Sequence, residues 1–216
     1  QLRITHCRLC QSGKIHKVAD LGYHPLADTF LPPEILFSGP ELSYPLQLGQ
    51  CNACGHVFTL YAVSPEDRYQ KTHYSYDSSN SKVSIQHFKE FAEAVLAEKA
   101  PSPSGIIVDI GSNVGTLLEH FQALGHRNVL GVEPSSNIAA LAGKAGIPTV
   151  HDFFCNRIIP QIREAGPVQL LLSANVLNHA DDLAALLETA KAVLADDGIF
   201  VFEVPYLLDL VKGTAF

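Results

Sequence analysis

The chain has 216 residues, of which 47% are hydrophobic and 17% are charged, and it carries a formal net charge of −7 at pH 7. This composition is that of an ordinary globular protein and excludes a disordered or fibrous one. The acidic balance argues against nucleic acid as the main partner, because phosphates repel an acidic surface. No apolar stretch approaches the roughly 18 residues that span a bilayer, and the N-terminus lacks the apolar core of a secretory signal. We therefore expect a cytoplasmic protein with no membrane and no nucleic-acid partner.

Methionine is absent from the whole chain, including position 1. For a chain with this much apolar content, that absence favours a piece of a longer protein over a complete gene product. The sequence leaves the oligomeric state open.

Two short-spaced cysteine pairs lie in the N-terminal part of the chain. "CRLC" contains Cys7 and Cys10, and "CNACG" contains Cys51 and Cys54. In a reducing compartment such pairs are more often zinc ligands than disulfides, and two such turns brought together make a tetrahedral thiolate site. We predict a closed, structural zinc site with these four ligands and with the flanking histidines as bystanders. The alternative is four unpaired thiols or two strained local disulfides.

Three regions follow from the pattern of apolar residues. Residues 1–70 are loop-rich, with short alternating runs around the second cysteine pair, and are expected to form a small zinc-binding domain. Residues 71–104 contain a run with apolar residues at helical spacing after serines that can cap it, and are expected to be a helical linker. Residues 105–216 alternate short apolar runs with helical patterns, which predicts an α/β, doubly wound parallel sheet. The expected strands of this third region are 106–110, 128–132, 147–150, 168–173 and 198–204, and the expected helices are 115–125, 136–146, 155–166 and 181–198.

The stretch "DIGSNVG" follows the first strand of this sheet, where open α/β sheets bind their ligands. Gly111 and Gly115 let the backbone approach a ligand closely. Asn113 and Thr116 stand where the dinucleotide fingerprint has its second and third glycines, which disfavours a pyrophosphate. Asp109, at the end of the strand, is also a poor neighbour for phosphates. The turn therefore predicts a nucleoside cofactor that carries a cation instead of a phosphate.

Glu133, in "GVEPS" at the end of the next strand, is placed to accept hydrogen bonds from two ribose hydroxyls. A ribose, together with a cationic group near Asp109, fits S-adenosylmethionine. After the third strand, Asp152 and Phe153 are expected to offer the adenine an edge partner and an apolar face. The alternative is a doubly wound domain with a tight first turn and no cofactor. The predicted cofactor residues are Asp109, Gly111, Ser112, Asn113, Gly115, Glu133, Asp152, Phe153 and Asn175.

Several motifs resemble the sugar C-methyltransferases of deoxysugar biosynthesis. In the α/β region these are "DIGSNVGTLLEHF", "GVEPSSNIA", "NVLNHADDL" and "GIFVFEVPYLLDLV". The segments "CRLC…CNACG", "PLADTF" and "YSYDSSNS" match the zinc-binding domain that this family carries ahead of its methyltransferase domain. The resemblance implies a Rossmann-like class I methyltransferase core. It also implies transfer of a methyl group to a carbon of a nucleotide-linked keto-6-deoxysugar.

The chain departs from that family in two places. In the family, "VPYLLDLV" is followed by a Tyr-x-Glu-His type segment, two further strands and a C-terminal domain, and this chain ends at Phe216 before them. We therefore expect the methyltransferase domain to be truncated and the isolated chain to bind its cofactor with little or no turnover. The second departure is Val114, which stands where the family usually has an acidic residue.

Methylation of carbon requires a base near the α-carbon of a ketone and a hydrogen-bond donor for the enolate oxygen. His179, just after the fourth strand, is of the residue type that serves as a base near neutrality. The resemblance implies that His179 is catalytic and that Tyr76 is an active-site group. The alternatives are a solvated or helix-capping histidine and a packed linker aromatic. As functions, an O- or N-methyltransferase acting on a small metabolite and a non-catalytic, zinc-stapled binding module stay open.

Overall fold

The structure is a computed structural model that describes residues 2–28, 30, 33–35, 39, 41–71 and 73–214. It contains two compact units, Gln1–Tyr76 with Asp181–Leu183, and Asp77–Ala180 with Ala184–Phe216. Thr29 of the "PLADTF" motif and the expected end of the second domain at Phe216 lie outside the described residues. Within the described part of the chain, no helix is both long and apolar enough to cross a bilayer.

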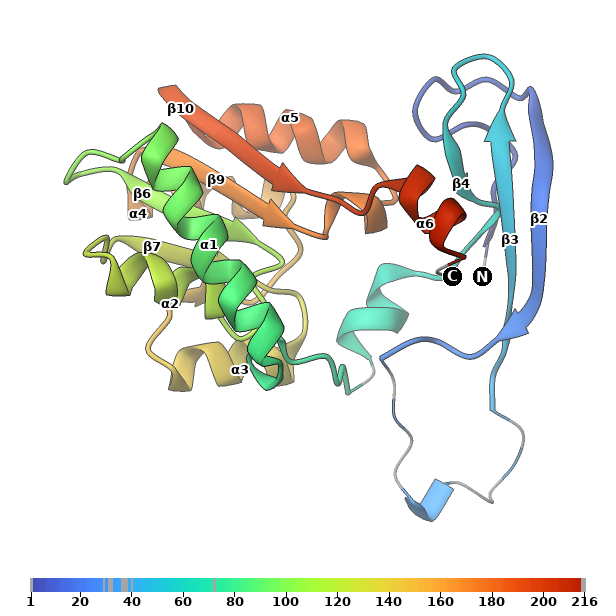
Figure 1. Ribbon diagram of the computed structural model, residues 1–216, viewed down its shortest axis with the longest axis horizontal. Coiled ribbons are helices and arrows are strands. Elements are labelled where there is room, and N and C mark those ends of the chain that lie inside the picture. Colours follow the sequence, from blue (N-terminus) through green and yellow to red (C-terminus); the bar gives the residue numbers. More distant parts are fainter. Residues whose placement is uncertain are drawn as a thin grey trace. The chain divides into compact units, whose positions relative to one another are not determined.

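The first unit is built on antiparallel strands (Figure 1). A three-stranded sheet has the order β2-β3-β4, and a second, two-stranded sheet pairs β1 with β5. The strands are β1 (Leu2–Arg3), β2 (Ile15–His24), β3 (Tyr44–Cys51), β4 (Val57–Thr59) and β5 (Tyr61–Ala62), and short turns η1 (Pro33–Ile35) and η2 (Glu66–Gln70) complete the unit.

The core of the first unit is small. Among the residues that the structure describes, its buried apolar cluster consists of Cys7, Cys51, Phe58 and Leu60. So few apolar side chains cannot offset the conformational entropy lost when a segment of this length folds, so the unit needs a further crosslink. Two of its four core residues are cysteines, which places the predicted metal ligands where that crosslink is needed.

Both cysteine pairs lie in turns with the same backbone hydrogen bonds. In each turn the carbonyl of the first cysteine accepts from the N–H four residues later, and its own N–H donates to the carbonyl five residues later. The residue after each pair adopts a left-handed backbone, with φ 60° at Gln11 and φ 78° at Gly55. The four bonds, each 2.9 Å long, are Gln11 N–Cys7 O, Cys7 N–Ser12 O, Gly55 N–Cys51 O and Cys51 N–His56 O.

The second unit contains a five-stranded parallel sheet with the strand order β10-β9-β6-β7-β8. The first strand in the chain, β6, is central; β7 and β8 follow on one side of it, and β9 and β10 lie on the other side. The carboxyl ends of β6 and β9 therefore flank the point where the strand order reverses, which is where such sheets bind ligands. The strands are β6 (Ile106–Ile110), β7 (Val129–Val132), β8 (Thr149–Val150), β9 (Val168–Ala174) and β10 (Leu194–Glu203).

Helices cover both faces of this sheet (Figure 1). Side chains of the central strands alternate between the two faces: Ile107 packs with α1 and α2, whereas Val108 packs with α4 and α5. The strands are consequently apolar on both faces, as the sequence predicted. The helices of the second unit are α1 (Lys82–Glu98), α2 (Thr116–Ala123), α3 (Ser136–Lys144), α4 (Ile159–Ala165), α5 (Leu183–Val193) and α6 (Leu207–Gly213), with short turns η3 (Ser78–Asn80), η4 (Asn156–Ile158) and η5 (Leu177–His179).

The helix α1 begins where its serines predicted. The hydroxyl of Ser81 accepts a hydrogen bond of 3.3 Å from the N–H of Ser84. Ala92 and Val95 of α1 are buried in the same cluster as α2 and the sheet. The segment expected as a linker thus contains a helix that packs into the second unit, and the domain boundaries at residues 70 and 104 stay a prediction.

The fold class is confirmed, and α6 and β1 lie outside the predicted elements. Two further local differences concern the helix before β10 and the strand β2. The helix expected to reach residue 198 ends at Val193, and Leu194 starts β10 by pairing with Val168. The pairing is irregular between Leu194 and Ile199, because an aspartate pair and a glycine lie between these two residues. The other difference is the ten-residue strand β2, which was not expected because most of its residues are exposed and its apolar residues do not alternate.

The two cysteine turns allow a matched test of their shared backbone. Gly55→Ala is expected to lower the free energy of unfolding of the first unit by about 1 kcal/mol, because a Cβ disfavours the left-handed conformation. No atom lies within 4 Å of a Cβ built at Gly55, so the cost comes from the backbone alone. Chemical denaturation measures it. Gln11→Gly, at the equivalent position, should leave stability unchanged or raise it, and an equal loss in both variants would contradict this account.

Candidate zinc centre and cofactor site

The side chains of Cys7, Cys10, Cys51 and Cys54 converge in the first unit. All four sulfur atoms lie within 4.8 Å of one another. Two contacts of 3.6 Å join sulfurs of different turns, Cys7 Sγ to Cys54 Sγ and Cys10 Sγ to Cys51 Sγ. A tetrahedron with Zn–S bonds of about 2.3 Å has edges of roughly 3.8 Å. The four thiols therefore fit a closed tetrahedral zinc site.

The thiols of this cluster do not ionise alike. Burial raises the pKa of Cys51, but the N–H groups of Ala53 and Cys54 and the Cys10 thiol outweigh burial and lower it to about 7. The N–H of His56 lowers the pKa of Cys54, but burial and the three neighbouring thiols raise it to about 12. Four thiolates this close need a cation to ionise together, because each one repels the others. The charge balance of the cluster thus favours a bound divalent metal.

The two flanking histidines have partners outside the sulfur cluster. The ring of His6 is paired at 3.1 Å with the hydroxyl of Thr5. The ring of His56 stacks on Phe58 with 5.3 Å between ring centroids. These contacts agree with the prediction that both histidines are bystanders.

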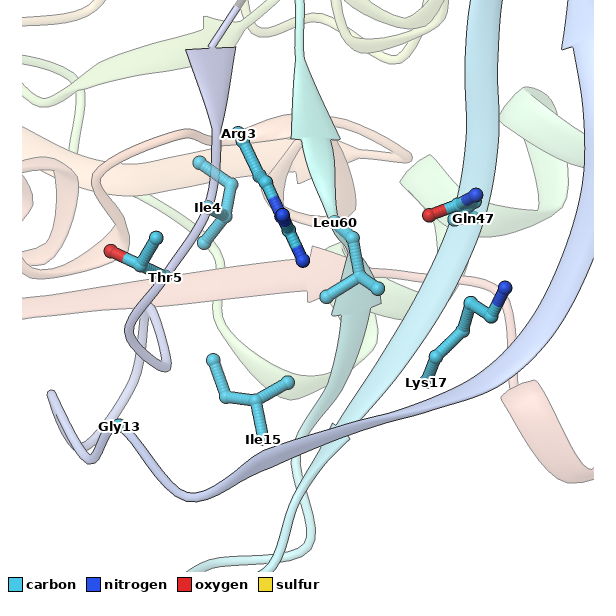
Figure 2. A pocket seen from close by; sticks show the side chains of 8 residues that line it. All are labelled: Arg3, Ile4, Thr5, Gly13, Ile15, Lys17, Gln47 and Leu60. Carbon is cyan, nitrogen blue, oxygen red and sulfur yellow. The ribbon is translucent and has the colours of Figure 1, made fainter.

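A separate pocket of about 370 Å³ lies in the first unit (Figure 2). The ammonium of Lys17 and the amide of Gln47 each donate to Asp20 over 2.8 Å, so their polar groups are already engaged. No predicted site residue lines this pocket. The lining residues are Arg3, Ile4, Thr5, Gly13, Ile15, Lys17, Gln47 and Leu60.

In the second unit, the turn after β6 has an unusual backbone. Gly111, Asn113 and Gly115 are all left-handed, with φ 65°, 52° and 92°. A Cβ built at Gly111 would lie 2.5 Å from Val176 Cγ2, and one at Gly115 would lie 2.7 Å from Ile147 Cγ1. Both glycines are thus required by the backbone conformation and by packing, in addition to any approach of a ligand.

Side chains from three other segments hold this turn in place. The N–H of Asn113 donates to Glu133 Oε2 over 3.1 Å, and its side-chain oxygen accepts from the N–H of Ser78 over 3.0 Å. The hydroxyls of Ser78 and Thr116 are hydrogen-bonded at 2.9 Å. Ser78, in η3 just before α1, therefore packs over the turn, and Thr116 bonds to it from the start of α2.

Two buried carboxyl groups lie at neighbouring strand ends. Asp109 and Glu133 are each only 4% exposed. Glu133 Oε1 accepts from the N–H of Ser135 over 2.8 Å, so both of its oxygens hold a backbone N–H. Burial raises the pKa of Glu133. Burial first, and the charge of Glu133 second, raise the pKa of Asp109 to about 7.

Asp109 also has an unsatisfied oxygen. Among the residues that the structure describes, Asp109 Oδ1, Ser112 Oγ and Ser135 Oγ are buried without a hydrogen-bond partner. Buried polar atoms normally have partners, and a cation beside a buried carboxylate lowers its pKa toward the ordinary range. The ammonium group of S-adenosylmethionine would supply such a cation at Asp109. Each oxygen of Glu133 keeps a second lone pair for a ribose hydroxyl, so the residues present fit this cofactor.

Asp152 follows β8, as predicted, and has a partner that the sequence did not indicate. Arg157 donates from Nη2 to Oδ1 over 2.6 Å and from Nε to Oδ2 over 3.3 Å, and the N–H of Phe153 donates to Oδ1 over 2.8 Å. Burial opposes ionisation of Asp152, but the hydrogen bonds to Arg157 and Phe153 lower its pKa overall. The carboxylate is thus ionised and oriented, and Phe153 beside it is half-buried.

Asn175 directly follows β9 and has a left-handed conformation with φ 59°. Its N–H donates to the carbonyl of Glu203 over 2.8 Å, and its side-chain Nδ2 donates to Glu203 Oε1 over 2.9 Å. Glu203 Oε2 pairs in turn with His87 Nε2 at 2.7 Å. Glu203 and His87 were not among the predicted site residues, although Glu203 lies one residue before the end of the strand predicted at 198–204 and so at the same sheet edge.

His179 and Tyr76 belong to different units. His179 lies in η5, just after β9, and is exposed; its ring Nε2 is 3.2 Å from Asn178 Nδ2. Tyr76 is the last residue of the first segment of the first unit, and it is 46% exposed. Within the second unit, His179 lies at the carboxyl edge of the sheet. The catalytic roles of His179 and Tyr76 stay predictions.

Comparison with known proteins decides the family. A family model described as a methyltransferase domain matches residues 68–212, and a second one, for a zinc-binding domain, matches residues 7–69. The chain belongs to the family of methyltransferase domains. S-adenosylmethionine is the cofactor of this methyltransferase, and its N-terminal part is a zinc-binding domain.

Among curated proteins, the methyltransferase is 30% identical over 214 residues to "C-methyltransferase NovU" of Streptomyces niveus, an alignment that covers 99% of this chain and 50% of NovU. It is 33% identical over 99 residues to a "Ubiquinone biosynthesis O-methyltransferase" of Rhodopseudomonas palustris (strain HaA2), covering 44% of this chain and 38% of that protein. The chain thus spans about half the length, or less, of these relatives.

Solved structures of other methyltransferases are similar over part of the chain. One is the plantazolicin methyltransferase BpumL in complex with SAH, with 17% identity and a TM-score of 0.46, covering 61% of this chain and 50% of that one. Another is an S-adenosylmethionine dependent methyltransferase from Mesorhizobium loti, with 28% identity and a TM-score of 0.44, covering 53% of this chain and 54% of that one.

The zinc site predicts about one zinc per chain by elemental analysis, as four thiolate ligands imply. Cys51→Ser is expected to lose the metal and unfold the first unit, with the α/β unit left intact in circular dichroism. Cys155→Ser, which changes a half-buried cysteine outside the cluster, should keep the full zinc content. Retention of a full zinc equivalent by Cys51→Ser, or two local disulfides in protein prepared under reducing conditions, would refute the assignment.

The buried carboxylate of Glu133 yields a test of the cofactor site. Glu133→Ala is expected to weaken S-adenosylhomocysteine binding by about 1–3 kcal/mol in calorimetry, because ribose hydroxyls and two backbone N–H groups lose their acceptor. NAD should not bind the wild-type protein. Glu119→Ala removes an exposed carboxylate from α2 and should bind like wild type. Equal affinities of wild type and Glu133→Ala would show that the ribose is held elsewhere.

Proposed function

We propose that this chain is the zinc- and cofactor-binding part of a C-methyltransferase that acts on a nucleotide-linked keto-6-deoxysugar. The observation that carries the proposal is the extent of the match to NovU, which runs through both units and covers 99% of the chain. The match to the ubiquinone biosynthesis O-methyltransferase covers only 44% of it. A relative that shares the zinc-binding domain as well as the α/β unit is the better guide to the acceptor.

The proposed reaction begins with removal of a proton from the carbon beside the sugar ketone. A ring nitrogen of His179 takes this proton and later releases it to solvent. The enolate oxygen, where negative charge develops, requires a hydrogen-bond donor, and the family resemblance implies this role for Tyr76. The methyl group would come from bound S-adenosylmethionine: the sugar carbon would gain it as the methyl–sulfur bond breaks, the enolate would revert to the ketone, and S-adenosylhomocysteine would leave.

Two features of the second unit support His179 as the base. It follows β9 at the carboxyl edge of the sheet, four residues after Asn175 and near the point where the strand order reverses. The amide of Asn178 lies 3.2 Å from His179 Nε2 and can donate to it. The contact is a hydrogen bond in the tautomer whose Nε2 carries no hydrogen, and it then orients the ring.

O-methylation is the second candidate, favoured by the 33% identity to the ubiquinone biosynthesis O-methyltransferase in the shared region. The two reactions differ in one measurable step. O-methylation removes the hydroxyl proton and leaves the α C–H bond intact, whereas C-methylation removes the α-proton, whose exchange with solvent can be measured. Methyl transfer and deuterium exchange measured on a panel of nucleotide-linked keto-deoxysugars therefore separate the two functions.

In the complete protein, His179→Asn is expected to lose methyl transfer by about 10²–10⁴-fold, the usual effect of removing a general base. Exchange of the sugar α-proton should fall with it, and affinity for S-adenosylhomocysteine should stay the same. His126→Asn is the control, because His126 lies between α2 and the start of β7, at the opposite edge of the sheet. Exchange at the wild-type rate in His179→Asn would assign the base to another residue.

A further inference from the structure

Three side chains from separate elements form a hydrogen-bonded row at the carboxyl edge of the parallel sheet. Asn175 Nδ2 donates to Glu203 Oε1 over 2.9 Å, and Glu203 Oε2 pairs with His87 Nε2 at 2.7 Å. We propose that Glu203 and His87 are positioning residues that hold Asn175 against the glycine turn and so preform the cofactor site. The proposal rests on the cofactor site described above, and it does not depend on which acceptor is methylated.

Asn175 needs such support because of its backbone. A residue other than glycine is disfavoured at φ 59°, although asparagine tolerates this region better than most. Glu203 binds Asn175 twice, through its backbone carbonyl at 2.8 Å and through its carboxylate. The two bonds fix both the backbone and the side chain of Asn175 at the end of β9.

Val176, the residue after Asn175, contacts the glycine turn. Val176 Cγ2 lies 2.5 Å from the point where a Cβ of Gly111 would stand, so the two segments are in close contact. Gly111 follows β6, which neighbours β9 in the sheet. A ligand bound where the strand order reverses meets both segments, so a shift of Asn175 would alter the surface that such a ligand contacts.

His87 orients the second carboxylate oxygen of Glu203, Oε2. Its ring packs beside Phe88 and Phe91 of the same helix, with ring centroids 5.8 Å and 6.5 Å away. These two phenylalanines pack against the buried core, so the imidazole is held at a defined place on α1. The side chains of His87 and Glu203 are 47% and 31% exposed. Because partly exposed ion pairs add little to stability, we assign the pair to positioning rather than to folding.

Calorimetry with S-adenosylhomocysteine and thermal melting, both on the 216-residue chain, test this proposal. Glu203→Ala is expected to weaken binding about tenfold, since a misplaced supporting hydrogen bond commonly costs 10-fold or more, with a melting temperature close to that of wild type. Glu203→Gln should restore binding to within about threefold of wild type, because its oxygen accepts from Asn175 and its amide donates to the other tautomer of His87. Lys89→Ala, which removes an exposed charge from α1, is the control and should change neither quantity.

Wild-type affinity in Glu203→Ala would overturn the proposal, as would equal losses in Glu203→Ala and Glu203→Gln. If Glu203→Ala does not fold, two further variants decide. His87→Phe keeps the ring packing and removes the donor, and Asn175→Gly keeps the left-handed backbone and removes the side chain; wild-type affinity in both would also overturn the proposal. Because S-adenosylhomocysteine binding involves no acceptor, these failures would leave the proposed methyl transfer to the sugar untouched.

Discussion

The two turns after β6 and β7, at the carboxyl edge of the parallel sheet, depend on one buried carboxylate. Glu133 accepts the N–H of Asn113 over 3.1 Å and that of Ser135 over 2.8 Å, and so it ties the turns after β6 and β7 together. A buried carboxylate is stable only when hydrogen bonds replace its lost water. Here one bond comes from the backbone of Asn113 in the left-handed turn after β6, and the other comes from the backbone of Ser135 after β7. The N–H of Asn113 stabilises the buried carboxylate, and the carboxylate in turn stabilises the conformation of the glycine turn by accepting this N–H.

That arrangement leaves an asymmetry between the two carboxyl groups at the edge. Glu133 is satisfied by backbone donors, whereas Asp109 is buried with one oxygen lacking a partner among the described residues. The pKa of Asp109 is raised to about 7 by burial and by the charge of Glu133. A cationic ligand beside Asp109 would lower this pKa, whereas a phosphate would raise it further. The same electrostatics that make this turn unsuitable for a dinucleotide make it suitable for a sulfonium nucleoside with an ammonium group.

The stability of the first unit depends on a cation that compensates the charges of its four thiolates, instead of on a large buried apolar core. In the described part of this unit, the buried core contains Cys7, Cys51, Phe58 and Leu60. Two turns with identical backbone hydrogen bonds bring four thiols within 4.8 Å of one another. Thiols this close are held together by a divalent cation, and the metal in turn replaces the core that so short a segment cannot build.

The amino-acid sequence by itself determined the α/β class and the central strand Ile106–Ile110, and it predicted the four cysteines that cluster in the first unit, because buried parallel strands and cysteine turns leave local patterns. It did not reveal β2, whose apolar residues lack alternation. Only the tertiary structure decided the partners at the sheet edge: Arg157 for Asp152, and Glu203 with His87 for Asn175. The reason is physical: such hydrogen bonds depend on which strand ends lie side by side. The order β10-β9-β6-β7-β8 arises from packing over the whole unit and from no local segment.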